Sequence, residues 1–218
     1  MHRMLSAFVL SPVVIFCVVA SAHKSFGQNQ PISVSVFSDV HIPQHLLAVS
    51  EQSASQIFSN AGINVAWINC VHALDAIPDP DCAKSYGPGD FVLRITSHVS
   101  SATRDSACGV AWLGAGGTGM YADIFWTRAQ QLQIHSGVDL GLILGSVMAH
   151  EMGHLLLGAN SHSVAGLMQA HWRSEELDRI AVGTLLFLPE QSQRMRARLS
   201  AVAVTMAVSR NGRPGIRP

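Results

Sequence analysis

The sequence predicts an α+β fold in a single domain: a mixed sheet with a long helix packed on it, followed by a helical C-terminal part. Short apolar segments bounded by turn residues recur up to residue 127, and helical patterns follow them up to residue 206. The composition supports a packed core, because 48% of the 218 residues are hydrophobic and only 13% are charged. A disordered binding protein is therefore not expected.

The N-terminus has the features of a secretory signal peptide. Arg3 supplies a positive charge, an apolar stretch covers 5–20, and the Ala-Ser-Ala sequence at 20–22 fits the small-x-small cleavage rule. We expect cleavage after Ala22, with a cut near Gln28 as the alternative. The apolar stretch is shorter than the ~20 residues of a spanning helix, which disfavours an uncleaved anchor. The mature chain is expected to be secreted or periplasmic, without stable membrane insertion.

Five segments have the character of strands. The first alternates apolar and polar residues, and the others are short runs rich in apolar, β-branched or aromatic residues. They cover 31–37, 63–68, 90–96, 108–113 and 120–127. Loops rich in Gly, Pro or small polar residues are expected between them over 69–89, 97–107 and 114–119.

Four segments have helical character. The longest runs over 140–157, with Asp139 as its expected N-cap and Gly158 directly after it. The others are expected over 43–60, 174–186 and 189–206, with loops over 128–138 and 159–173. The single domain is therefore expected to cover 31–206, between the signal peptide at 1–22 and a disordered tail at 207–218.

Three cysteines remain once the signal peptide, which contains Cys17, is removed. Cys70 and Cys82 bracket a loop rich in proline and aspartate, and export permits a disulfide between them. Such a closed loop would stabilise the fold by ~3 kcal/mol. Cys108 is the odd residue and is interpreted as a small buried hydrophobe.

The charge balance points away from nucleic acid as a partner. The chain has 14 basic and 14 acidic residues, so its formal net charge is zero with histidine counted as neutral. A basic patch of the kind that binds nucleic acid is not expected. The sequence makes no prediction of the oligomeric state.

The chemistry of the chain is concentrated in the motif HEMGH at 150–154 within the long helix. His150 and His154 are four residues apart, so both side chains leave one face of the helix and can bind one zinc ion. Glu151 points about 100° around the helix and can act as a base towards water on that ion. Such polar residues are costly in an apolar helix unless paired or bound to metal. The alternative is two core histidines bonded to backbone carbonyls.

A catalytic zinc site needs a third protein ligand and an open fourth position. Gly158 allows the chain to turn back after the helix, and His162 follows it closely. We therefore favour His162 as the third ligand of a single Zn²⁺ ion. A carboxylate from Glu175 or Glu176 is the alternative, since both residues lie early in the next predicted helix.

The segment HEMGHLLLGANSH, followed by GLM, resembles the metzincin clan of zinc endopeptidases. The clan signature is HExxHxxGxxH, followed by a turn that contains a methionine. His150, Glu151 and His154 match it residue by residue. Gly158 and His162 match in role, at four and eight residues after the second histidine instead of three and six.

The resemblance covers roughly 31–172 and is strongest over 147–168. It extends to uncharacterised exported bacterial proteins with HExGHLLLGxNSHSxxGIM-like segments. It implies a zincin-like fold with a mostly parallel sheet of about five strands and an antiparallel edge strand, here 108–113, that aligns a peptide substrate. It implies Met168 as the turn methionine. No tyrosine follows Met168, and His171 is the candidate transition-state donor, with an ordinary loop histidine as the alternative.

These observations predict an exported zinc-dependent endopeptidase that acts on peptides or proteins. Two other functions stay open: a non-catalytic protein in which zinc is a structural staple, and a hydrolase that acts on a cell-wall peptide or another amide. Glu151 favours an enzyme, because a structural zinc site needs no general base.

Overall fold

The fold was obtained as a computed structural model, which describes residues 31–70, 80–83, 87, 89–99, 107–115 and 117–211. The predicted signal peptide at 1–22 and most of the loop 69–89 lie outside these residues. The described chain forms a mixed five-stranded sheet with helices, in agreement with the predicted α+β class.

The sheet has the strand order β2-β1-β3-β5-β4. Its first four members in this order pair in parallel, and β4 pairs with β5 in the antiparallel direction at one edge. All five strands lie where the sequence predicted them, within three residues at each end. Their bounds are β1 Ile32–Ser38, β2 Val65–Asn69, β3 Asp90–Thr96, β4 Gly109–Trp112 and β5 Tyr121–Phe125.

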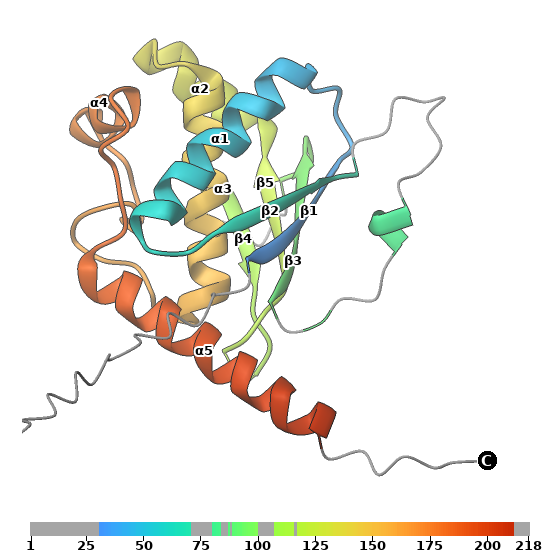
Figure 1. The fold of residues 1–218 in the computed structure, drawn as a ribbon. Helices are drawn as coiled ribbons and strands as arrows, with labels where there is room; N and C mark the ends of the chain where they lie inside the picture. The colour runs from blue at the N-terminus through green and yellow to red at the C-terminus, as the bar shows by residue number, and fades with distance from the viewer. Residues whose placement is uncertain are drawn as a thin grey trace, which may run out of the picture.

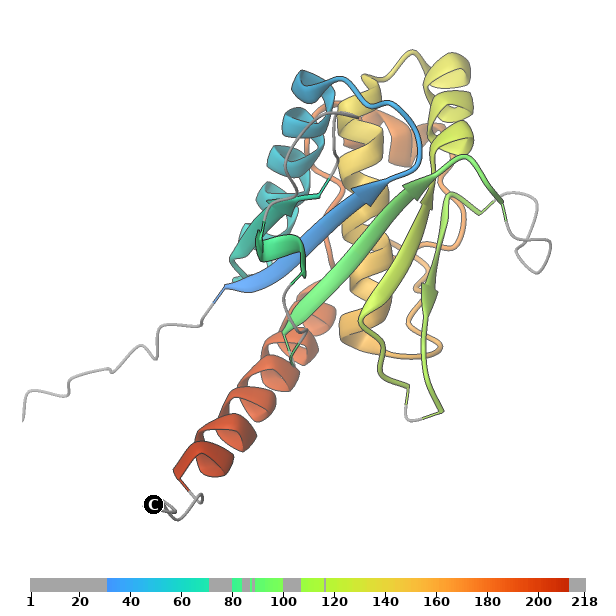
Figure 2. The same cartoon turned by 90° about the vertical axis from the view of Figure 1, so that its right-hand side faces the viewer.

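Helices α1 (Gln44–Asn60) and α3 (Leu140–Leu157) lie side by side on one face of the sheet (Figures 1 and 2). Sixteen of the 18 residues of α3 are buried, so this helix is the centre of the core. Gly145 lets the two helices approach closely, because a Cβ there would lie 2.4 Å from the Ser50 carbonyl oxygen of α1. The Asp139 side chain caps α3 by accepting hydrogen bonds from two backbone N–H groups, as predicted.

Helix α3 is long and apolar enough to cross a membrane, but 89% of its apolar window is buried inside the fold. This burial is typical of the core helix of a globular domain. Helix α5 (Pro189–Asn211) crosses the molecule at the C-terminal end of α3, in the lower part of Figure 1.

Three helical predictions need correction. Residues 126–136, expected to end a strand and begin a loop, form helix α2 (Trp126–Ser136), which Gly137 ends in the left-handed conformation. The helix expected over 174–186 is shorter, α4 (Ser174–Ala181), because the chain turns at Gly183 with a φ of 70°. Helix α5 extends beyond 206 into the expected tail, and 212–218 lie outside the described residues.

Cys70 and Cys82 form the predicted disulfide, with Cα atoms 5.7 Å apart. It joins the end of β2 to a short 3₁₀ helix, η1 (Pro80–Ala83). Cys108 is a free thiol that is half-buried beside β4, which agrees with its interpretation as a small residue packed against the core.

Candidate metal centre and active site

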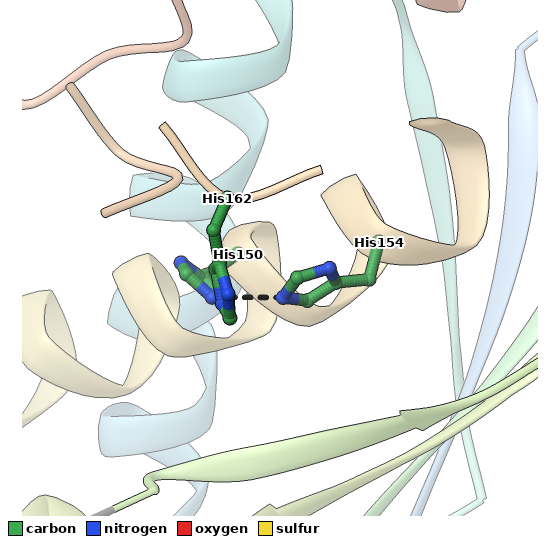
Figure 3. A group of neighbouring side chains, drawn as sticks. All are labelled: His150, His154 and His162. Carbon is green, nitrogen blue, oxygen red and sulfur yellow. Dashed lines mark hydrogen bonds between the residues drawn. The ribbon is translucent and has the colours of Figure 1, made fainter. Parts of the chain in front are cut away.

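His150 and His154 project from one face of α3, one helical turn apart, as their spacing predicts (Figure 3). Their Nε2 atoms are 3.1 Å apart. His150 is buried and His154 is half-buried. The pair therefore lies at the border of the core, where one side of the rings can contact a ligand.

The chain turns back after α3 and brings a third histidine to this pair. Gly158 has a φ of 88° and Asn160 a φ of 56°, and the chain reverses its direction at these two residues with positive φ. The His162 ring centroid then lies 4.6 Å from that of His154 and 5.5 Å from that of His150 (Figure 3). One ligand atom from each histidine lies within 4.8 Å of the other two. The turn thus accommodates the two residues by which the spacing from His154 to His162 exceeds that of the HExxHxxGxxH signature.

The other ring nitrogens of the helical pair are held by the loop that follows α3. His150 Nδ1 lies 2.8 Å from the Leu167 carbonyl oxygen, and His154 Nδ1 lies 2.7 Å from Ser161 Oγ. Trp172 Nε1 donates to the same Leu167 oxygen at 3.1 Å, and its ring meets His150 edge to face. These contacts fix both imidazole planes and leave the Nε2 atoms to face one another.

The donor set fits a zinc ion. Two nitrogens at zinc–nitrogen distances of 2.0–2.1 Å in a tetrahedral site are about 3.3 Å apart, close to the 3.1 Å between His150 Nε2 and His154 Nε2. Burial lowers the pKa of His150 to about 4 and that of His154 to about 3, and the neighbouring imidazoles contribute further to the lowering for His154. Both rings are therefore neutral at pH 7, which is the form that binds metal.

Glu151 lies on α3 beside the histidine cluster and is only 5% exposed. Burial raises the pKa of its carboxyl group to about 8, while a hydrogen bond with the backbone of Ala111 in β4 acts in the opposite direction. A cation held by the histidines would favour the carboxylate form. Gly109 makes this packing possible, since a Cβ there would lie 2.7 Å from Glu151 Cγ. Edge strand β4 and the general-base candidate are thus in direct contact.

A cavity of ≈ 540 Å³ unites these groups, a size typical of ligand sites. Its walls are β4, the histidine face of α3 and the loops on both sides of Met168. They include all three histidines, Glu151, His171 and Cys108. Burial raises the pKa of Cys108 to about 11, with the charge of Glu151 adding to the effect, so this residue is a thiol at neutral pH.

The two glutamates that were the alternatives for the third ligand lie in other surroundings. Glu176 accepts hydrogen bonds from Gln169 Nε2 and from the backbone N–H of Arg173, both at 2.9 Å, and so caps the start of α4. Glu175 is exposed, and both glutamates line a second cavity of ≈ 480 Å³. Of the three candidates, only His162 joins the cluster of helical histidines within the described residues.

Met168 lies fully buried against the motif helix, at the position that the resemblance implies for the turn methionine. A Cβ at Gly153 would lie 2.5 Å from Met168 Sδ, so the glycine inside the motif is what admits this contact. Met168 directly follows Leu167, whose carbonyl oxygen lies next to His150 Nδ1. The packing of Met168 against α3 therefore holds the turn that contacts the histidine pair.

His171 is exposed and lines both cavities, so it borders the cluster without belonging to it. Its role as a transition-state donor stays a prediction. Sequence reasoning missed Ser161, the Leu167 carbonyl and the Ala111 backbone. These groups act through hydrogen bonds that depend on where the loop and β4 fold back, and no residue spacing announces them.

Comparison with known proteins gives little beyond this geometry. No family model matches the chain, and no curated protein matches its sequence. Among solved structures, the chain is similar to archaemetzincin from Methanopyrus kandleri, with a TM-score of 0.49 and 16% sequence identity. The match covers 78% of this chain and 96% of that one.

Proposed function

We propose that this chain is an exported zinc-dependent endopeptidase, with His150, His154 and His162 as the ligands of one zinc ion and Glu151 as the general base. The proposal is supported by the arrangement of a buried glutamate and three convergent histidines, which line the same cavity beside edge strand β4. Bound zinc would supply a water molecule with a pKa near ~7 and would polarise a peptide carbonyl.

The chain's own residues divide the remaining work. The Glu151 carboxylate accepts a proton from the attacking water and passes it to the leaving amine, because it faces the same cavity as the three ring nitrogens. The Leu167 carbonyl and Ser161 hydroxyl hold the His150 and His154 rings in place. His171, on the cavity wall, is the candidate donor to the developing oxyanion.

Strand β4 is the proposed platform for the substrate. It pairs with β5 on one side, and its residues Gly109, Val110 and Ala111 line the cavity. An extended peptide can add to such an edge through main-chain hydrogen bonds, which places a peptide bond beside Glu151. This arrangement favours a peptide or protein substrate over a small-molecule amide.

The position of Glu151 also favours an enzyme over a structural zinc site. A structural site closes all four positions with protein ligands, whereas three histidines leave one position for water. A buried carboxyl group that makes no contribution to a structural site would be costly to retain in an apolar core. Catalysis gives this cost a purpose.

The test is hydrolysis of a mixed peptide library by the mature chain, with Glu151→Gln as the variant and Glu175→Gln as the matched control. The wild-type chain and both variants are expected to bind one equivalent of zinc. Glu151→Gln is expected to cleave at least ~10² times more slowly, since it keeps the side-chain shape and loses the base. The control is expected to cleave like wild type, because Glu175 is exposed and outside the cavity.

Three other results would argue against this proposal or a part of it. Equal product patterns from wild type and Glu151→Gln would reject Glu151 as the base. Zinc binding without any cleavage would support the structural staple, and cleavage confined to cell-wall peptides would support the amide hydrolase. Export is tested separately: N-terminal sequencing of the chain secreted by a bacterial host is expected to begin at residue 23, after cleavage at Ala22.

A further inference from the structure

The side chains of edge strand β4 alternate between the two faces of the sheet. Gly109 and Ala111 lie on the α3 side: a Cβ at Gly109 would lie 2.7 Å from Glu151 Cγ, and Ala111 packs against the core. Because successive side chains of a strand point to opposite faces, Trp112 belongs to the outer face. The contacts agree with this, since Trp112 Nε1 donates a hydrogen bond to Asp123 on the outer face at 2.9 Å.

The indole ring of Trp112 is held in place, although the residue is 48% exposed. Its Nε1 donates to Oδ2 of the buried Asp123, whose Oδ1 accepts from Arg94 Nε and Tyr121 Oη. A ring that is already fixed loses little side-chain entropy when a ligand packs on it. Trp112 therefore has an ordered and accessible apolar surface, which is typical of a residue that contacts a ligand.

A peptide that adds to β4 would place a side chain beside this ring. Strand β4 is the last in the sheet order, and β5 lies on its other side. A peptide strand at this edge alternates as β4 does, so every second side chain of the peptide lies on the outer face. Neighbouring side chains on one face of a sheet have Cβ atoms about 5 Å apart and contact one another. One side chain of the peptide therefore packs against Trp112.

We propose that Trp112 is a specificity-determining residue that selects an aromatic side chain in the substrate. The inference rests on the proposed endopeptidase and on peptide addition to β4. An aromatic side chain on the indole buries apolar area and adds an edge-to-face or offset-stacked contact. Arg94 and Asp123 pair with one another beside the ring at 2.8 Å, so the surface offers a charged side chain no unpaired partner.

The register along β4 gives the place of this side chain in the substrate. Glu151 contacts β4 at Gly109 and at the backbone of Ala111, so we expect the scissile bond beside these residues. Trp112 is the next residue, at ~3.3 Å per residue along the strand. The selected side chain is therefore within about three residues of the scissile bond. Its two neighbours in the peptide point to the other face, away from Trp112.

The test starts from the best-cleaved peptide of the mixed library. Phenylalanine or alanine replaces each of the three residues on either side of the scissile bond in turn, and kcat/KM is measured with the zinc-loaded wild-type chain. Phenylalanine is expected to be favoured over alanine about five- to tenfold at the position beside Trp112, as an aromatic cross-strand contact implies. The same values for phenylalanine and alanine at all positions would overturn the proposal.

Variants show whether Trp112 causes the preference. Trp112→Ala is expected to lower it to less than about twofold at that position and to leave the other positions unchanged. Trp112→Phe keeps a ring and is expected to retain a preference of about threefold or more. Met120→Ala is the matched control with full preference, because Met120 is equally exposed and lies outside β4. Aromatic preferences that all persist in Trp112→Ala would contradict the proposal.

NMR of the indole ring decides the question if Trp112→Ala does not fold. The same phenylalanine and alanine peptides are added to the zinc-loaded Glu151→Gln variant, which is expected to bind them with little cleavage. The indole signals of Trp112, assigned with Trp112→Phe, are expected to shift through the ring current of one phenylalanine peptide and to shift less with its alanine counterpart. Shifts of equal size for every pair of peptides would reject the contact.

The outcomes separate this inference from the proposed function. Cleavage without a preference that depends on Trp112 would reject the role of Trp112 and keep the endopeptidase. Peptide binding with the indole shift, but without cleavage by the wild-type chain, would reject the endopeptidase and keep Trp112 as a peptide contact. Absence of both cleavage and binding would reject both.

Discussion

Gly153 supports the candidate site because it leaves room for side chains that pack against α3. It stands between Glu151 and His154 on α3, where a Cβ would lie 2.5 Å from Met168 Sδ and 2.8 Å from Phe187 Cε1. Contacts this short force neighbouring atoms to move. Met168 directly follows Leu167, whose carbonyl holds His150, so movement of the methionine would disturb the histidine pair.

Replacing Gly153 by alanine is therefore expected to destabilise the fold by about 1–2 kcal/mol, since overpacking outweighs the better helix propensity of alanine. Urea unfolding of the metal-free chain measures the change. Truncating its neighbour tests the cause: in a cycle with Met168→Ala, the double variant should lose less than the sum of the two single variants. Strict additivity would show that the two residues do not interact.

At the scale of elements, edge strand β4 is tied to the sheet by a buried carboxylate on the face opposite α3. Asp123 of β5, which is 5% exposed, accepts hydrogen bonds from Arg94 Nε at 2.8 Å, Tyr121 Oη at 2.6 Å and Trp112 Nε1 at 2.9 Å. Burial raises the pKa of Tyr121, and the hydrogen bond to Asp123 and the charge of Asp123 raise it further. One side chain thereby joins β3, β5 and β4.

Asp123→Ala is expected to lower the free energy of unfolding by about 2 kcal/mol, because three donors lose their common acceptor. The partial exposure of Arg94 keeps the figure below that of a fully buried ion pair. Asp178→Ala, on the exposed side of α4, is the control and should change stability by less than about 0.5 kcal/mol. Similar losses of unfolding free energy in both variants would show that the network does not hold β4.

Elements with a strong local signal could be predicted from the sequence, and elements without one could not. Asp139 and Gly158 mark the two ends of α3, and the structure places both ends there. Helix α2 was missed because Ala129 is its one buried residue, so little apolar periodicity marks it. Helix α4 was predicted too long, because apolar residues continue past Gly183 although the backbone turns there.

The residues of the candidate site could likewise be predicted only where the sequence has a local signal. The spacing of His150 and His154 places two ligand candidates on one face of a helix, whatever the rest of the fold does. His162 could be favoured because a glycine precedes it, but the left-handed conformation of Asn160 is a property of the folded turn. Ser161 enters the site only through that turn, and its partner nitrogen cannot be named from sequence.

At the scale of the whole molecule, helix α5 closes the domain by holding the ends of other helices. Arg198 Nη1 donates to the Leu156 carbonyl oxygen at the end of α3, and Arg196 Nη1 donates to the Ala61 carbonyl oxygen after α1. Positive charge at helix C-termini is favourable, and these bonds satisfy carbonyls without helical partners. Helix α5 thus fixes the C-terminal ends of α1 and α3.

The stability of the whole metal-free molecule should depend on pH through the histidine pair. The pKa of His150 and His154 falls to about 4 and about 3 on folding from 6.5. Below pH 6.5 the unfolded chain therefore binds protons that the folded chain does not bind. The free energy of unfolding is expected to fall as the pH drops from 6.5 towards 4.

Urea unfolding with a chelator present, at pH values from 7 to 4.5, measures this dependence against His150→Gln/His154→Gln. The wild type should lose on the order of 5 kcal/mol more than the double variant over this range, about half of it through each histidine. Glu151 has a raised pKa and contributes stability that is lost as pH rises from 4.5 towards 8. It is present in both proteins, so its effect largely cancels. Parallel pH profiles would contradict the buried, neutral state of the two histidines.

We propose that three histidines and no other protein side chain hold one zinc ion, and the measurement that tests this is zinc-edge X-ray absorption of the mature chain with one equivalent of zinc. We expect three imidazole nitrogens and one oxygen at about 2.0–2.1 Å, with two imidazoles remaining in His162→Ala. A sulfur atom at about 2.3 Å from zinc, which would indicate Cys108, or a spectrum unchanged by His162→Ala would rule out the three-histidine site.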